Sequence, residues 1–498
     1  MAFYDPVHGL SLISNSEQGL QSLWQDPDKY HLNSIFSICD TLEFKRLHFL
    51  RQAGFCFQSY PSATHTRFGH SIGTCHLGRA ALDQVDIRIT NKNRIKLGEW
   101  LREIQTNSGK KDLRDEFLVA LLLHDVGHFP FSHVLESNPH LKNAGFPHHE
   151  EIAVDMILNN QRNKIVKAYN DALDSELISH IGALRLFKIL NHMQDSGQID
   201  SNVLAYLICH ERQRELADII NDPPLVEKLN LLCNLVSGVV DIDRLDHYIR
   251  DLYFTGTGLS VFNVFKLLNA IYLDETNGKV YVDQDALPQA FNLLHSKEHL
   301  RRYIFEDPKN MAFNAMLNYC VSSYVKAQEL GELTCKYGTP RPIEVLLTLT
   351  DDQLLSELEL VLKPASISKM VQLIRIGCPY ELMECLKVAA LHDGQTLAQR
   401  AEYLSSNLAI SFLENTLPST LFLLQDTKGK VSLFSMDELF YVNNTGTEFS
   451  IREAAGFQYL IRHLSAESEN QELRCWVFSK PGKSEADIND LKEKLTVL

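Results

Sequence analysis

The chain has 498 residues, of which 45% are hydrophobic and 22% charged, and its formal net charge is −15 at pH 7. This length is too great for one hydrophobic core, so we expect two or three. The composition is that of a soluble globular protein, and no apolar run approaches the roughly 20 residues that span a bilayer. The acidic balance argues against nucleic acid as a partner unless one face is locally basic, but it allows an anionic small substrate bound beside a metal ion.

The ten cysteines are scattered along the chain, without a CxxC pair. A chain of this size needs no disulfide framework, so we predict reduced thiols in a cytoplasmic protein. Residues 1–6 lack the basic and apolar regions of a secretory signal peptide, which agrees with that expectation.

Helical periodicity dominates residues 35–330, where apolar side chains recur at i, i+3 and i+4. The clearest stretches, in chain order, are residues 36–52, 72–82, 115–124, 150–158 and 224–240. Polar interruptions at residues 89–114 and 191–202 are typical of surface connections or short irregular segments. The fold class that we predict is therefore mainly α.

The composition changes towards the end of the chain. Short runs with strand-like composition occur at residues 420–424, 430–434, 439–442 and 474–478. The sequence Asp-Thr-Lys-Gly at residues 426–429 predicts a hairpin turn between the first two runs. We therefore expect a helical domain at residues 1–330 and a smaller α+β region at residues 331–498, with a boundary somewhere between 330 and 410.

One apolar helix runs directly into adjacent histidine and aspartate side chains, His124 and Asp125, and helix-breaking residues follow. Neutral imidazole and carboxylate together suit borderline divalent metals, and a helix end holds both at a cavity wall. A His-Asp pair alone is a weak signal, because about one is expected by chance among 20 histidines. His392 and Asp393 form a second such pair, for which we favour the ordinary interpretation, a helix end followed by a turn.

Two further clusters accompany the first pair. His70 lies at or just before the start of a helix, and Asp243 lies in the charged run 241–251 behind an apolar helix. At helical spacing Asp243, Asp246 and His247 share one face. An isolated run of this kind is more often a solvated, salt-bridged helix face. Here it follows a stretch that looks buried, and two other clusters of metal-ligand type exist, which favours a site.

Three clusters in the order His, His-Asp, Asp would give a metal ion two imidazoles and two carboxylates. Such a set leaves positions open for water and a phosphate oxygen, which hydrolysis requires. The sequence does not select the metal, because Mn, Fe, Co, Ni, Zn and, less well, Mg suit these ligands.

The order and flanks of these motifs resemble the HD superfamily, and more closely its deoxynucleoside triphosphate triphosphohydrolase branch, which includes bacterial dGTPase-like enzymes and the vertebrate SAM-and-HD-domain dNTP hydrolase. The similar segments are residues 5–9, 40–47, 67–73, 124–133, 149–150 and 241–251. The resemblance implies a helical HD-domain core, a divalent metal bound by His70, His124, Asp125 and Asp243, and hydrolysis of a dNTP to deoxynucleoside and triphosphate. It also implies a homo-oligomer, because relatives assemble into dimers of dimers or larger rings.

Carried over residue by residue, the resemblance implies a catalytic pocket beside the metal. His133 and His149 match two pocket histidines, and Glu136 stands where the family often has an aspartate. An imidazole titrates near neutral pH, so we expect His133, oriented by Glu136, to protonate the departing 5′-oxygen. His128 either reaches the same pocket or supports it as a hydrogen-bond partner.

The resemblance also implies a set of substrate contacts. Gln52 would contact the sugar 3′-hydroxyl, and Asp251 would help to hold the sugar. Arg67, Arg244 and, by a looser match, Lys297 would contact phosphate. His247 stands where relatives commonly carry a tyrosine.

Several alternatives stay open at this point. Ala53 stands where a bulkier residue can block a ribose 2′-hydroxyl, so the exclusion of ribonucleotides is undecided. Asp40 matches an acid that reads guanine at an activator site in some relatives, but Lys45 and His48 differ from the expected neighbours, so nucleotide activation is undecided too. The substrate can also be a nucleoside monophosphate, a cyclic nucleotide or a signalling nucleotide. A non-catalytic nucleotide-sensing scaffold is the third interpretation, against which the complete ligand set argues.

Overall fold

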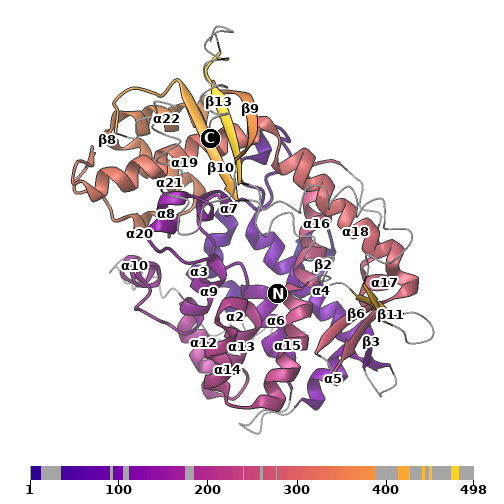
Figure 1. The fold of residues 1–498 in the computed structure, drawn as a ribbon. Helices are drawn as coiled ribbons and strands as arrows, with labels where there is room; N and C mark the ends of the chain where they lie inside the picture. The colour runs from indigo at the N-terminus through magenta and orange to yellow at the C-terminus, as the bar shows by residue number, and fades with distance from the viewer. Residues whose placement is uncertain are drawn as a thin grey trace.

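The computed structural model describes residues 2–12, 35–89, 94–104, 112–173, 184–238, 241–257, 262–275, 278–388, 399, 413–426, 440–442, 448–450, 473–481 and 489. Within these residues the architecture is mainly helical, with sheets of short strands towards the periphery (Figure 1). The predicted fold class is confirmed. Among the described helices, none combines the length and apolarity that a membrane crossing requires.

Three helices form the centre of the molecule: α4 (Arg67–Gln84), α6 (Arg114–Leu123) and α16 (Ile242–Phe254). Nearly all of α6 is buried, which is the behaviour of a helix that is apolar on every side. It lies very close to α4 at Gly78, where an added Cβ would overlap the side chain of Leu121. Asp241 is the N-cap residue of α16, and its side chain accepts a hydrogen bond from the backbone N–H of Arg244 (2.6 Å).

Further helices pack around this centre. They are α9 (His149–Ile157), α10 (Lys164–Leu173), α12 (Leu186–Asp195), α13 (Ser201–Ile208), α14 (Gln213–Ile220) and α15 (Pro223–Ser237). Two of the predicted stretches correspond closely to α9 and α15. A buried ion pair between Arg185 and Glu43 (2.8 Å) fixes the start of α12 against the N-terminal helices.

The predicted helix at residues 36–52 is wrong as a single element. It is divided into α2 (Ile35–Cys39), α3 (Leu42–Lys45) and the 3-10 turn η2 (Arg46–Phe49). The cause is Thr41, whose side chain accepts a hydrogen bond from the backbone N–H of Phe44 (3.3 Å) and so begins a new helix. The stretch 89–114, expected as a surface connection, contains β4 (Ile95–Lys96) and α5 (Leu97–Glu103).

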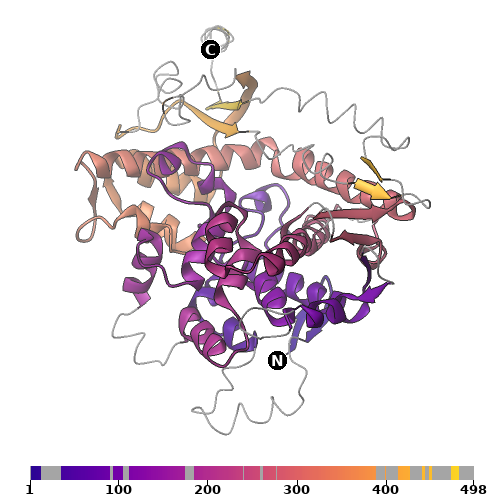
Figure 2. The ribbon, with the colours of Figure 1, turned by 60° about the horizontal axis from the view of Figure 1, so that its bottom comes forward.

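The C-terminal sheet has the order β10 (Thr420–Asp426), β13 (Leu473–Ser479), β9 (Glu381–Val388), and its pairings are antiparallel. It lies over the long helix α19 (Pro308–Glu329), on the side away from the N-terminal helices (Figure 2). The helices α20 (Ile343–Leu346), α21 (Asp351–Glu359) and α22 (Ala365–Ile376) complete this part. The predicted strands at 420–424 and 474–478 are confirmed, whereas the run 430–434 and most of the turn 426–429 lie outside the described residues.

A second sheet joins distant parts of the chain. Its order is β12 (Glu448–Ser450), β11 (Phe440–Val442), β6 (Lys279–Asp283), β5 (Ile271–Asp274), β3 (Asp86–Ile89) and β4. β11 pairs in parallel with β6, with Tyr441 opposite Val282. The division at residue 330 stays a prediction, and strands from both sides of it share this sheet.

Candidate functional site

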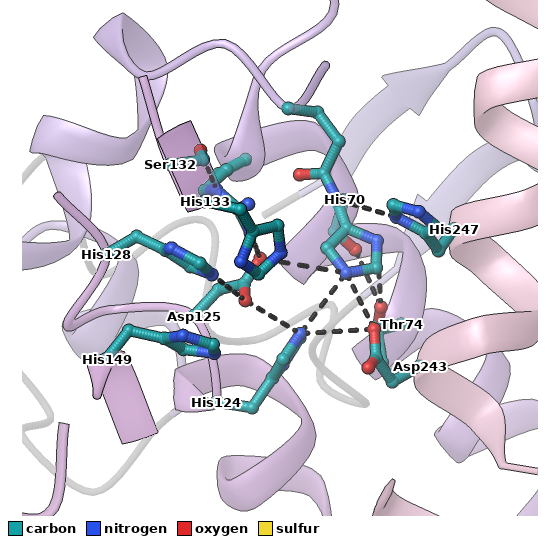
Figure 3. A network of polar contacts seen from close by, with 12 residues as sticks. His70, Thr74, His124, Asp125, His128, Ser132, His133, His149, Asp243 and His247 are labelled. Carbon is teal, nitrogen blue, oxygen red and sulfur yellow. Dashed lines mark hydrogen bonds and ion pairs between the residues drawn. The ribbon is translucent and has the colours of Figure 1, made fainter. Parts of the chain in front are cut away.

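The four predicted metal ligands come together where α4, the end of α6 and the first turn of α16 meet (Figure 3). His70 Nε2 lies 3.2 Å from His124 Nε2 and 2.9 Å from Asp243 Oδ1. His124 Nε2 lies 3.3 Å from Asp243 Oδ1 and 3.5 Å from Asp125 Oδ1. His70 Nε2 and Asp125 Oδ2 are 3.7 Å apart. Donor atoms of His70, His124 and Asp125 therefore lie close enough to hold one metal ion, and Asp243 contacts both histidines beside them.

These separations suit a divalent metal ion. Ligand atoms bound at about 2.1 Å around a metal lie roughly 3.0 to 3.4 Å from their neighbours, and the two Nε2 atoms here lie 2.9 to 3.7 Å from each other and from the nearest oxygens of Asp125 and Asp243. Two imidazoles and two carboxylates fit several borderline metals, so the structure leaves the identity of the metal open.

Hydrogen bonds fix both imidazoles with Nε2 towards the centre. His124 Nδ1 donates to the carbonyl oxygen of Leu121 (2.9 Å), and His70 Nδ1 donates to Asp246 Oδ2 (2.7 Å). Burial lowers the pKa of His70, but hydrogen bonds to Asp243 and Asp246 outweigh burial and raise the pKa to about 10. The environment of Nε2 therefore favours a positive charge, which a proton or a metal ion can supply.

Asp246 is held in turn by a buried network that reaches the N-terminal strand β1 (Ala2–Asp5). Its carboxylate accepts hydrogen bonds from His8 Nε2 (2.6 Å) and from Arg250 Nε (2.8 Å) and Nη2 (2.9 Å). Arg250 also donates to both oxygens of Asp5 (2.9 and 2.7 Å). We had assigned no role to Asp5, His8, Asp246 or Arg250. The only sequence signal was that all four lie in the segments 5–9 and 241–251.

Arg67 contacts both ends of the loop that follows α6, residues 124–132. Its guanidinium forms an ion pair with Asp125 and donates from Nε to Ser132 Oγ (2.6 Å). Burial raises the pKa of Asp125, but Arg67 and His124 lower it well below its usual range. Asp125 is therefore ionised, as a metal ligand must be.

The predicted catalytic residues form a second cluster around Glu136, and Figure 3 shows two of its histidines, His133 and His149, beside Asp125. Glu136 accepts hydrogen bonds from Nδ1 of His133 (2.7 Å) and Nδ1 of His149 (2.6 Å). His128 stacks on His149, with ring centroids 3.6 Å apart, and its Nε2 lies 3.2 Å from Asp125 Oδ1. His128 thus connects the two clusters. The side chain of His133 is 53% exposed, whereas Glu136 is largely buried, so His133 is the member of the pair that faces outward.

His247 connects the two residues expected to bind the sugar, Gln52 and Asp251, and the three form a third cluster. Gln52 and His247 Nδ1 are in hydrogen-bond contact (2.9 Å), and His247 Nε2 lies 3.1 Å from Asp251 Oδ2. The other oxygen of Asp251 contacts His65 Nε2 (2.6 Å), a residue to which the sequence had given no role. Phe305, in the π-helical turn Leu300–Phe305, stacks on His247 with a centroid distance of 6.2 Å.

Two of the expected phosphate contacts, Arg244 and Lys297, lie near each other on α16 and α18 (Leu287–His299). Arg244 pairs with Asp241 (3.4 Å), and 37% of its side chain is exposed. Burial lowers the pKa of Lys297 to about 8, and the charge of Arg244 contributes to the shift. Because the two positive charges repel each other, an anion bound between them would stabilise both.

Comparison with known proteins identifies a family domain and distant relatives. Residues 67–236, about a third of the chain, match the family model of the HD domain. An uncharacterized protein of Mycoplasma genitalium is 27% identical over 285 residues, which cover 56% of this chain and 53% of that protein. The SAMHD1 homolog of Dictyostelium discoideum, named a deoxynucleoside triphosphate triphosphohydrolase, is 29% identical over 224 residues, 45% of this chain and 34% of that one. The protein of that name from Danio rerio is 24% identical over 311 residues, 60% of this chain and 44% of that one.

The chain spans about half the length of the first curated relatives it matches. The fold as a whole resembles the crystal structure of a phosphohydrolase from Bacteroides thetaiotaomicron, with a TM-score of 0.57 and 17% identity over 97% of this chain and 100% of that one. The resemblance inferred from the motifs is confirmed. The chain contains an HD domain, and SAMHD1 proteins are among its distant relatives.

The close packing beneath His70 gives a first prediction. A Cβ on Gly73 would overlap the Asp246 carboxylate and the Arg250 guanidinium, whereas one on Gly69, in the same helix, would meet Arg250 at an ordinary 3.6 Å. We expect Gly73→Ala to displace Asp246 and weaken metal binding by about 10- to 100-fold, the usual effect of losing a partner of a metal-binding histidine. Titration calorimetry with Mn²⁺ measures the change.

Gly69→Ala is the matched control, because it has the same helix propensity gain of about 1 kcal/mol without the overlap. Equal metal affinity in the two variants would contradict the role given to Asp246.

Proposed function

We propose that the protein is a metal-dependent phosphohydrolase that cleaves deoxynucleoside triphosphates into deoxynucleoside and intact triphosphate. The observation that carries the proposal is the junction of two clusters at Asp125: a donor set of two imidazoles and two carboxylates, and a group of histidines around Glu136. Relatives named deoxynucleoside triphosphate triphosphohydrolases support the choice of substrate.

In this proposal His70, His124, Asp125 and Asp243 hold the metal, which when bound lowers the pKa of water and polarises the phosphate. Arg67 keeps Asp125 ionised and lies at the edge of the phosphate site. Arg244 and Lys297 supply the remaining positive charge for a triphosphate.

His133 is the proton donor in this mechanism. Glu136 holds its Nδ1, so Nε2 is the ring nitrogen that meets the departing 5′-oxygen. Burial raises the pKa of Glu136, but His149 and His128 lower it well below its usual range, so the carboxylate is ionised and can accept the hydrogen bond from His133 Nδ1. His149 has its Nδ1 on the same carboxylate and helps to fix it.

The deoxyribose binds in this proposal beside Gln52, His247 and Asp251, which already contact one another. The finer expectations belong to the same proposal: a homo-oligomer in the cytoplasm, with nucleotide activation undecided. The alternative substrates are nucleoside monophosphates, cyclic nucleotides and signalling nucleotides. Their hydrolysis would use the same metal centre but give different products.

The product assay tests the proposal directly. The purified protein is incubated with each of the four dNTPs and four NTPs in the presence of Mn²⁺ or Mg²⁺, and the products are separated by ion-exchange chromatography. We expect nucleoside and intact tripolyphosphate, and we expect Asp125→Ala and removal of metal by a chelator to abolish both. Asp393→Ala changes the other His-Asp pair and serves as the matched control with unchanged activity.

Release of phosphate or pyrophosphate instead of tripolyphosphate would contradict this reaction. So would the absence of turnover on all eight nucleotides by protein with bound metal, and the assay would then move to monophosphate, cyclic and signalling nucleotides.

The lowered pKa of Lys297 gives a prediction for the pH profile. Because its pKa is about 8, the ammonium that contacts phosphate is lost as the pH rises through 8. We expect kcat/KM for the substrate to fall above that pH. Lys297→Arg remains protonated and should move the falling limb to higher pH, whereas Lys266→Arg, at an exposed position, should leave the profile unchanged. If the limb stays near pH 8 in Lys297→Arg, another group sets it.

A further inference from the structure

The loop 124–132 has an unusual backbone where it leads into His133. Phe131 and Ser132 have φ angles of 55° and 54°, and neither is glycine. Two successive residues of this kind persist only where their surroundings hold them. Packing supplies part of the restraint, because Phe131 is fully buried and stacks on Phe55 with a centroid distance of 4.4 Å.

A single carboxylate beyond the matched HD domain supplies a second restraint. Asp351, the first residue of α21, accepts hydrogen bonds from the backbone N–H of Phe131 (2.7 Å) and the backbone N–H of Arg51 (2.9 Å). The carbonyl oxygen of Arg51 in turn accepts a hydrogen bond from Ser132 Oγ (3.2 Å). Asp351 therefore joins the backbone just before Gln52 to the backbone just before His133.

Arg46 connects the same parts of the molecule at a second point. Its buried guanidinium donates to the carbonyl oxygen of His128 (2.8 Å) in the loop. It also donates to the carbonyl oxygens of Leu347 (3.2 Å) and Leu349 (2.8 and 3.0 Å), between α20 and α21. All of these acceptors are backbone groups, so the contacts fix where the chain lies.

We propose that residues 343–351 form a clamp, acting through Asp351 and Arg46, that positions the loop 124–132 for catalysis. The clamp holds Ser132 against Arg67 and ties the backbone next to Gln52 to the backbone that leads into His133. It gives a function to a part of residues 331–498 that lies outside residues 67–236. Asp351 and Arg46 are positioning residues, and the kinetic part of this inference rests on the proposed function.

A carboxylate suits this position because two backbone N–H groups need acceptors at once. Burial raises the pKa of Asp351 to about 6, which leaves it ionised near pH 7.5 with both oxygens able to accept. Removing the side chain leaves both N–H groups in buried surroundings without their acceptor.

The same residue has an ordinary structural role that the test must separate. Asp351 and Asp352 both lie in the first turn of α21, where acidic side chains favour the helix dipole, and Thr350 and Gln353 form a capping box there. Asp352 is exposed. Asp352→Ala therefore removes the same helix-terminal charge and leaves the loop contacts in place.

The experiment compares full-length wild type, Asp351→Ala, Asp351→Asn, Arg46→Met and Asp352→Ala in three measurements. They are bound metal per chain, hydrogen exchange by mass spectrometry of peptides that cover residues 49–52 and 129–134, and kcat and KM in the nucleotide assay. We expect Asp351→Ala to keep its metal, to lose exchange protection in both peptides, and to lose kcat on the order of 10²-fold, with a smaller change in KM. Asp351→Asn keeps one acceptor and should lie between Asp351→Ala and wild type.

The clamp also predicts how the variants combine. Arg46→Met removes a charge of the opposite sign and should nevertheless lower kcat, because it releases the same loop. The double variant of Arg46→Met and Asp351→Ala should lose less than the product of the two single effects. Asp352→Ala should behave as wild type in all three measurements.

Loss of protection and of kcat to the same extent in Asp352→Ala would overturn the clamp, because the effect would then belong to the helix end. Retained protection in Asp351→Ala would overturn it as well. If Asp351→Ala does not fold, Asp351→Asn makes the same comparison. If wild type turns over no nucleotide, the proposed function fails, and the exchange measurement still decides whether the clamp exists.

Discussion

The buried pair of Asp246 and Arg250 is the interaction on which the candidate metal centre depends. Removing two charges from water is costly unless their hydrogen bonds are satisfied. Here Asp246 accepts from His8, His70 and Arg250, and the remaining donors of Arg250 meet Asp5. The network is therefore a rigid support under His70. It requires α4 and α16 to lie close together, which is why Gly73 cannot carry a side chain without displacing it.

The acidic and basic side chains of the candidate site have different positions. The carboxylates of Asp125 and Asp243 face the centre, where a metal ion would neutralise them. Arg67 pairs with Asp125, and Arg244 and Lys297 lie near each other on α16 and α18. In the proposed function, a chain with a net charge of −15 thus still supplies three cations for the phosphates. The low effective dielectric of a buried pocket makes these local charges count for more than the distant surface.

The sequence predicted those parts of the molecule that depend on local pattern. α6 and α15 follow from apolar periodicity, and the proximity of His70 and His124 to Asp125 and Asp243 follows from the resemblance of their motifs to a known family. Residues 36–52 could not be predicted as they are, because one hydroxyl group at Thr41 outweighs a periodic pattern. The charged face of α16 reads as a solvated, salt-bridged surface when it is isolated, yet Asp246 and Arg250 are buried. Their partners His8 and Asp5 lie 238 and 245 residues away in the chain, a distance over which no periodicity carries information.

The extent of the site also shows why the matched domain is not the whole functional unit. Asp243 lies beyond residues 67–236, and so does the Asp246 network that orients His70. The N-terminal strand supplies Asp5 to the same network, and Asp351 holds the loop from the other side. The matched region by itself contains His70, His124 and Asp125, but neither the fourth donor residue nor the groups that fix their positions. The proposed chemistry therefore depends on packing between the domain and the flanking chain, and a change far from the predicted metal ligands can act on them through that packing.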